Sequence, residues 1–126
     1  DYYMAVYTAV MKELQKDNNL NSEELDASIL SHIKENFANE ELSLQYLTNR
    51  FGVSSKYISL LCKNEFGMTY LQYIQKQRIN YAVELLKTTD YTLEKIGVMC
   101  GYASTLTFRR NFKMITGVNP SDYRGR

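Results

Sequence analysis

The 126 residues are 44% hydrophobic and 23% charged, which suits a soluble globular protein with one core or two very small ones. The net charge of +1 is uneven, because residues 1–41 hold three basic and nine acidic residues, net −6, whereas residues 42–126 hold twelve basic and five acidic residues, net +7. No stretch approaches the roughly 20 apolar residues of a membrane helix and no signal peptide is visible, so we expect a cytoplasmic protein without membrane contact in this fragment.

Apolar residues recur at helical spacing nearly throughout the chain, which predicts an all-α fold. Residues 1–21 are expected to form an N-terminal helix, over residues 2–16, and a polar linker. A main domain over residues 22–126 then opens with a helix that Asn21 and Glu24 begin as a capping box and that ends near Asn39. Its inward positions are Leu25, Ile29, Ile33 and Phe37. Because the chain starts at Asp1 and not at Met, we expect a piece of a longer protein.

A pair of short helices follows at about residues 43–66. Ser43 is expected to start the first helix, which buries Leu44 and Leu47 and ends near residue 51. Gly52 suits the tight turn because glycine adopts positive φ, and Ser54 caps the second helix. Two short helices around a glycine turn are typical of a helix-turn-helix.

The capping box of Thr69 and Gln72 predicts a long connecting helix over residues 70–87, about 27 Å in length. A second helix pair is expected at about residues 92–117, with helices over 93–100 and 105–116 and Gly117 as the C-cap. Pro120 then begins a last short helix.

The second helix pair repeats the first. Ser43 and Gly52 match Thr92 and Gly101 at an offset of 49, and Ser54 and Gly67 match Ser104 and Gly117 at an offset of 50. Two copies are too few for a solenoid, so the repeat indicates a duplicated module. The predicted fold is therefore all-α, with two helix-turn-helix units joined by a long connecting helix and an additional N-terminal helix.

The second helix of a helix-turn-helix lies in the DNA major groove. In the first unit Ile58, Leu61 and Cys62 should be buried, which leaves an outward stripe of Ser55, Lys56, Ser59, Leu60 and Lys63. In the second unit Phe108, Phe112 and Ile115 should be buried, and the outward stripe is Thr105, Leu106, Arg109, Arg110 and Lys113, with Thr107 at its margin. Arginine suits bidentate contact with guanine, so Arg109 or Arg110 is the strongest candidate for reading a base, and Lys63 for a phosphate. The predicted partner is double-stranded DNA, with the two readers in grooves about 34 Å apart.

Other chemistries lack their signatures. Cys62 and Cys100 have apolar neighbours and no metal-ligand spacing, which favours buried thiols. The single histidine, His32, has no evident acid–base partner, and the chain has no glycine-rich phosphate loop. We therefore expect no enzyme, and no catalytic residue, cofactor or metal.

The chain resembles the AraC/XylS-type bacterial transcription regulators over about residues 29–124. The resemblance is carried by residues 92–96, 101–102, 108–113, Gly117 and 120–124, and by residues 77–86 of the connecting helix. It implies a seven-helix domain that binds adjacent major grooves of a promoter, acts as an activator in contact with RNA polymerase, and belongs to a parent protein with an N-terminal receiver or sensor part that could dimerise. The base-facing sites of the family fall on Lys56, Ser59, Leu60, Thr105, Leu106, Thr107, Arg109 and Arg110. Cys62 departs from the usual Phe, and Thr48 and Gly97 depart from the usual Ala.

A protein-interaction module on a helix-turn-helix scaffold is the alternative. Tyr2, Tyr3 and Tyr7 suggest a contact surface on the first predicted helix, although simple packing explains them equally well. The two functions differ in salt dependence, because only DNA binding releases counterions from phosphates.

Overall fold

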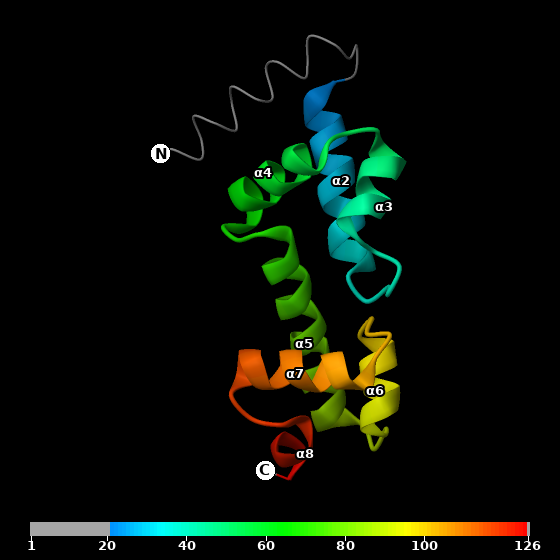
Figure 1. Cartoon of the computed structure of the whole chain (residues 1–126), viewed down its shortest axis with the longest axis vertical. Coiled ribbons are helices and arrows are strands. Elements are labelled where there is room, and N and C mark those ends of the chain that lie inside the picture. Colours follow the sequence, from blue (N-terminus) through cyan, green and yellow to red (C-terminus); the bar gives the residue numbers. More distant parts are fainter. Residues whose placement is uncertain (1–20, 126) are drawn as a thin grey trace. The chain divides into compact units, whose positions relative to one another are not determined.

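The computed structural model describes residues 21–125, and within that range the chain is helical without strands (Figure 1). The helices are α2 (Ser22–Asn36), α3 (Leu44–Phe51), α4 (Ser55–Phe66), α5 (Tyr70–Thr88), α6 (Leu93–Met99), α7 (Thr105–Thr116) and α8 (Pro120–Arg124). The all-α prediction is confirmed. The helix predicted over residues 2–16 lies outside the described residues.

The described chain divides into two compact units. Among the described residues, unit 1 contains residues 21–35 together with Leu42–Tyr73, and therefore holds α2, α3, α4 and the first turn of α5. Unit 2 contains the connector Asn36–Glu41 and the residues from Ile74 onward, and so holds the rest of α5 with α6, α7 and α8. Each unit thus contains one of the two predicted helix pairs.

Side-chain caps define the helix pair of unit 1. Ser43 Oγ accepts from the Tyr46 N–H at 3.0 Å and Ser54 Oγ from the Tyr57 N–H at 3.1 Å, while Gly52 ends α3 with φ +68°. These bonds satisfy N–H groups that lack a partner within the helix. The core of this unit is formed by the buried side chains of Ile29, Ile33, Leu47, Tyr57, Ile58, Leu61 and Cys62.

Two expectations for unit 1 were wrong in detail. Helix α2 ends at Asn36 and not near Asn39, because the Asn39 N–H closes a turn onto the Asn36 carbonyl and the Asn39 side chain accepts from the Glu41 N–H at 2.9 Å. Phe37 consequently lies outside the helix and packs edge-on against Tyr81 in unit 2. Leu44, expected to be buried, is half-buried.

Unit 2 has a core of Ile79, Ala82, Leu85, Leu86, Ile96, Cys100, Tyr102, Phe108 and Phe112. Helices α6 and α7 lie side by side, and Thr92 and Ser104 cap their N-termini (Figure 1). Their packing is close, because a Cβ atom on Gly97 of α6 would lie 3.2 Å from the Phe108 ring of α7. The absence of a side chain at Gly97 therefore leaves room for this phenylalanine.

Two arginines in unit 2 donate hydrogen bonds to backbone carbonyls of loops. The Arg78 Nε donates to the Phe37 carbonyl at 2.6 Å and its Nη2 to the Asn39 carbonyl at 3.1 Å, which attaches the connector to α5. Arg124 of α8 donates to the carbonyls of Tyr91 and Thr89, at 2.6 and 3.2 Å, and so holds the turn before α6. Charge-assisted bonds to carbonyls of this kind are stronger than neutral ones.

Candidate nucleic-acid interface

Helix α4 of unit 1 separates its buried and outward residues in the predicted way. Ile58, Leu61 and Cys62 are buried, as expected, and Tyr57 joins them. On the predicted outward stripe, three side chains are exposed and two are half-buried. The exposed ones are Ser55, Lys56 and Ser59, and the half-buried ones are Leu60 and Lys63.

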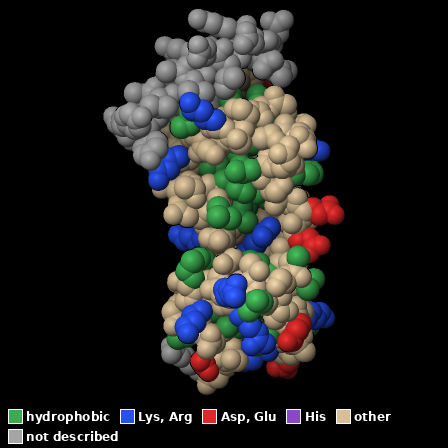
Figure 2. Space-filling model, viewed as in Figure 1, with side chains coloured by type: hydrophobic (Ala, Val, Ile, Leu, Met, Phe, Trp, Pro, Cys, Tyr) green, Lys and Arg blue, Asp and Glu red, His purple; other side chains and the backbone are tan. Residues whose placement is uncertain are grey.

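Helix α7 of unit 2 presents the denser stripe. Phe108 and Phe112 are fully buried, while the exposed side chains are Leu106, Thr107, Arg109, Arg110 and Lys113. Thr105 is half-buried, and Leu106 is 57% exposed. Figure 2 shows Lys and Arg side chains gathered over α7, with hydrophobic side chains among them. Cations beside exposed apolar groups are the chemistry that phosphates, base edges and thymine methyl groups require.

The expected burial of Ile115 was wrong, because its side chain is 38% exposed. Tyr123 of α8 packs edge-on against the buried Phe112, at 5.7 Å between ring centroids. Met114, next to Ile115, is 63% exposed. The C-terminal turn of α7 therefore carries an apolar surface next to the basic one.

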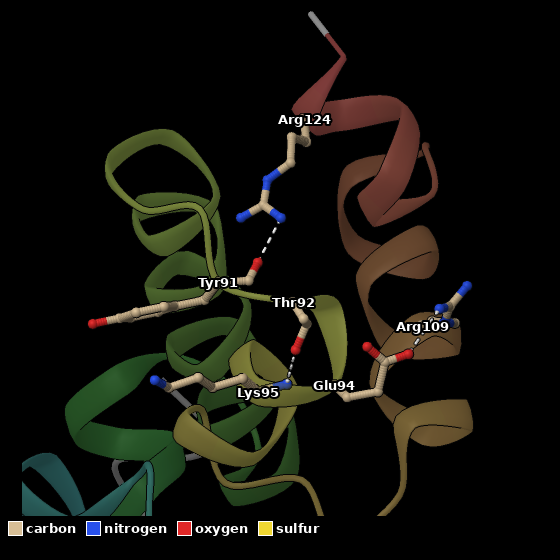
Figure 3. A network of polar contacts seen from close by, with 6 residues as sticks. All are labelled: Tyr91, Thr92, Glu94, Lys95, Arg109 and Arg124. Carbon is tan, nitrogen blue, oxygen red and sulfur yellow. Dashed lines mark hydrogen bonds and ion pairs between the residues drawn. The ribbon is translucent and has the colours of Figure 1, made fainter.

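A carboxylate that the sequence reasoning did not select lies beside the outward stripe of α7. Glu94 Oε1 of α6 is 3.7 Å from Arg109 Nη2, and Figure 3 shows the two side chains pointing toward each other. Its signal in the sequence is an acidic residue in the first turn after the Thr92 cap, which is a position that the helix dipole favours. Among the described residues, Arg110 and Lys113 have no such ion pair.

Three titratable groups outside the two stripes, His32, Cys62 and Cys100, are packed against other side chains. The His32 ring stacks on Tyr46 and meets the edge of Phe51, and burial, with a smaller effect of Arg50, lowers its pKa. Cys62 and Cys100 are free and buried, as predicted, and burial raises the pKa of each thiol to about 12. Thiols with such pKa values stay protonated near neutral pH.

Two searches cover the described residues only. In residues 21–125, no three His, Cys, Asp or Glu side chains lie together in a way that would hold a metal ion. None of the described helices combines the length and the apolar character needed to cross a bilayer.

Comparisons with known proteins agree with this arrangement. A family model described as a helix-turn-helix domain matches residues 47–126. The F1 operon positive regulatory protein of Yersinia pestis is 34% identical over 97 residues, which cover 77% of this chain and 32% of that protein. The chain thus spans about a third or less of the curated relatives it matches.

Two solved structures share the fold. The C-terminal domain of the two-component response regulator yesN from Fusobacterium nucleatum matches with a TM-score of 0.72 and 28% identity, over 83% of this chain and 99% of that one. The DNA-binding domain of AdpA, solved in complex with a target DNA, matches with a TM-score of 0.71 and 25% identity, over 79% of this chain and 89% of that one. Because it has two capped helix pairs and matches these proteins in sequence and fold, the chain belongs to the AraC-type helix-turn-helix family of DNA-binding transcription regulators.

Proposed function

We propose that the chain binds double-stranded DNA sequence-specifically through both helix pairs, with α4 and α7 each entering a major groove and the two grooves adjacent on a promoter. The observation that carries the proposal is the pair of outward polar stripes at equivalent positions of the repeat, on the second helix of each pair. Helices in this position of a helix-turn-helix read base edges. The net charge of +7 over residues 42–126 supports a polyanionic partner.

The stripes divide into base-reading and phosphate-binding residues. Near the N-terminus of α4, Lys56 and Ser59 are exposed donors suited to base edges or phosphates. On α7, Arg110 is the leading base reader, because arginine can donate two parallel hydrogen bonds to guanine. Lys63 and Lys113 lie a turn further along their helices and are assigned to phosphates.

Activation of transcription is the proposed outcome of binding. A relative that is 34% identical is named a positive regulatory protein, which supports an activator role. Contact with RNA polymerase is the proposed route to activation. The parent protein would add an N-terminal part that senses a signal or dimerises. Activation, signal sensing and dimerisation are thus proposed for the whole protein, in addition to the DNA contacts proposed for this chain.

Selection from a random duplex pool, followed by binding titrations at several salt concentrations, tests the function. We expect the selection to enrich one site. The logarithm of the association constant should fall linearly with the logarithm of the salt concentration, with a slope of about −0.9 per phosphate contact. Arg110→Ala should weaken binding to that site by about 1–3 kcal/mol and relax preference at one base pair, whereas Lys113→Ala should weaken all duplexes alike and flatten the salt slope.

Lys76→Ala is the matched control, because it removes an exposed positive charge from α5 and leaves the stripe of α7 intact. If Arg110→Ala reduced affinity no more than Lys76→Ala did, its role as base reader would be wrong. Binding to a protein partner without salt dependence, together with no enriched duplex, would instead support an interaction module.

A further inference from the structure

We propose that Glu94 determines specificity by directing Arg109 toward base edges and away from phosphates. The inference rests on the proposed function, since it concerns which DNA groups α7 contacts. It assigns a role to a residue of α6, the first helix of the second unit, that lies outside the outward stripe of α7.

The pair is placed so that it can act at the DNA-facing surface. Glu94 Oε1 lies 3.7 Å from Arg109 Nη2, and the side chains keep 66% and 46% of their surface exposed. The guanidinium is therefore open to a ligand while a carboxylate stands beside it (Figure 3). An ion pair with this exposure is weak, so DNA can compete with it or share the arginine.

The backbone position of Glu94 is set by its own helix and does not depend on Arg109. Thr92 Oγ1 accepts from the Lys95 N–H at 3.1 Å and so defines the first turn of α6, in which Glu94 lies. The Lys95 ammonium lies 4.0 Å from the centre of the Tyr91 ring, and Arg124 holds the Tyr91 carbonyl (Figure 3). Lys95, the next residue along α6, thus has an aromatic partner of its own, and the ion pair of Glu94 is with Arg109.

The two possible DNA ligands of Arg109 differ in charge. A phosphate is an anion, and bringing it to a guanidinium that already has a carboxylate neighbour adds like-charge repulsion. The guanine edge offers neutral N7 and O6 acceptors, so the carboxylate repels it far less. Arginine has several N–H donors, and one can remain on Glu94 while two others meet guanine. Glu94 therefore penalises phosphate contact more than base contact.

This bias separates Arg109 from the other cations of α7. Within the described part of the chain, Arg110 and Lys113 have no carboxylate at ion-pair distance. Their attraction to phosphates is not offset in this way. On α7, the penalty on phosphate contact therefore applies to Arg109 alone, whereas Arg110 and Lys113 remain free to contact either bases or phosphates.

Glu94→Gln tests the inference, because it removes the charge and keeps the shape. We expect Glu94→Gln to tighten binding to a random-sequence duplex about two- to fivefold, which is the affinity change that corresponds to the free energy of an exposed ion pair. The slope of log affinity against log salt should steepen by about 0.9, because one phosphate contact is gained. Affinity for the selected site should rise less, so that the ratio of specific to random binding falls.

Glu84→Gln is the matched control, since Glu84 is an exposed glutamate on α5 of the same unit and the change in net charge is identical. In an Arg109→Ala background, Glu94→Gln should have no more effect than Glu84→Gln. The inference is overturned if the two Gln variants behave alike in the parent chain, or if the Glu94→Gln effect persists without Arg109. If the unsubstituted chain preferred no duplex, the proposed function itself would be overturned. That result is obtained before any variant is tested, so it is distinguishable from a failure of the inference about Glu94.

Discussion

Gly101→Ala should disrupt the attachment of the connector in unit 2. Gly101 has φ +105°, in a region that residues with a Cβ atom rarely adopt. A Cβ atom there would lie 2.9 Å from the backbone C and O atoms of Ala38 and 2.8 Å from Arg78 Nε. The connector backbone must therefore move, and its movement strains the bond from Arg78 to the Phe37 carbonyl.

The expected loss has two parts. Positive φ costs a non-glycine residue about 1–2 kcal/mol. Loss of one hydrogen bond to a charged group costs about 1.5–3 kcal/mol, and the Arg78 to Phe37 bond, which is partly buried, is the one at risk. Together they predict that Gly101→Ala lowers the free energy of unfolding of unit 2 by about 2.5–5 kcal/mol.

Gly117→Ala provides the matched control in the same unit. Gly117 has φ +85°, but a Cβ atom there would meet nothing within 4 Å, so only the strain of about 1–2 kcal/mol should appear. Urea unfolding followed by circular dichroism measures both variants. Equal losses in the two variants would refute the close approach of Ala38 and the role of Arg78 in holding the connector.

Three further predictions concern the buried groups. Phe108→Ala should lower the free energy of unfolding by about 3–5 kcal/mol in calorimetry, because the side chain is fully buried, and a loss below about 1 kcal/mol would contradict its central place in the core. Burial raises the pKa of Cys62 and Cys100 from 9.0 to about 12, so the folded chain should resist thiol reagents at pH 8, and rapid labelling without unfolding would count against this. The free energy of unfolding should also fall as pH rises from 9 toward 12, because only the thiols of the unfolded chain ionise in that range. The lowered pKa of His32 means that stability should decline as pH falls below 6.5, and this part of the pH dependence should vanish in His32→Asn, as urea titrations at pH 7.5 and 5.5 can check.

Much of the fold was predictable because its signals are local. The helix starts at Ser43, Ser54, Thr92 and Ser104 each depend on a hydroxyl that accepts from an N–H three residues later. The Thr69 and Gln72 capping box likewise forms both of its reciprocal bonds within three residues. A pattern of this reach can be read without knowing the rest of the structure.

The remaining features depend on contacts between distant segments. Arg78 binds carbonyl groups 41 and 39 residues earlier in the chain, and no local pattern predicts such partners. Ile115 has the spacing of a buried residue, yet its side chain is 38% exposed, because helical spacing does not say which segments pack on that turn. Glu94 was recognisable as an acid in a helix start, but its relation to Arg109 arises only when α6 and α7 pack together.

The two copies of the repeat are alike in scaffold and unlike in surface. Gly67 and Gly117 end α4 and α7 with the same bond, each N–H donating to the carbonyl of the lysine four residues before it. Outward positions differ, because the half-buried Leu60 of α4 corresponds to the exposed Arg110 of α7 at the offset of 50.

Equivalent glycines show that even the scaffold is not uniform. Gly52 and Gly101 both have positive φ, but a Cβ atom at Gly52 would meet nothing within 4 Å, whereas Gly101 has the connector against it. Duplication therefore reproduces what a turn or a cap requires locally, and leaves each copy subject to the segments that pack on it. For the same reason, the change in unfolding free energy measured for a substitution in one copy does not apply to the equivalent position of the other copy. The contribution of each unit to base recognition likewise has to be measured separately.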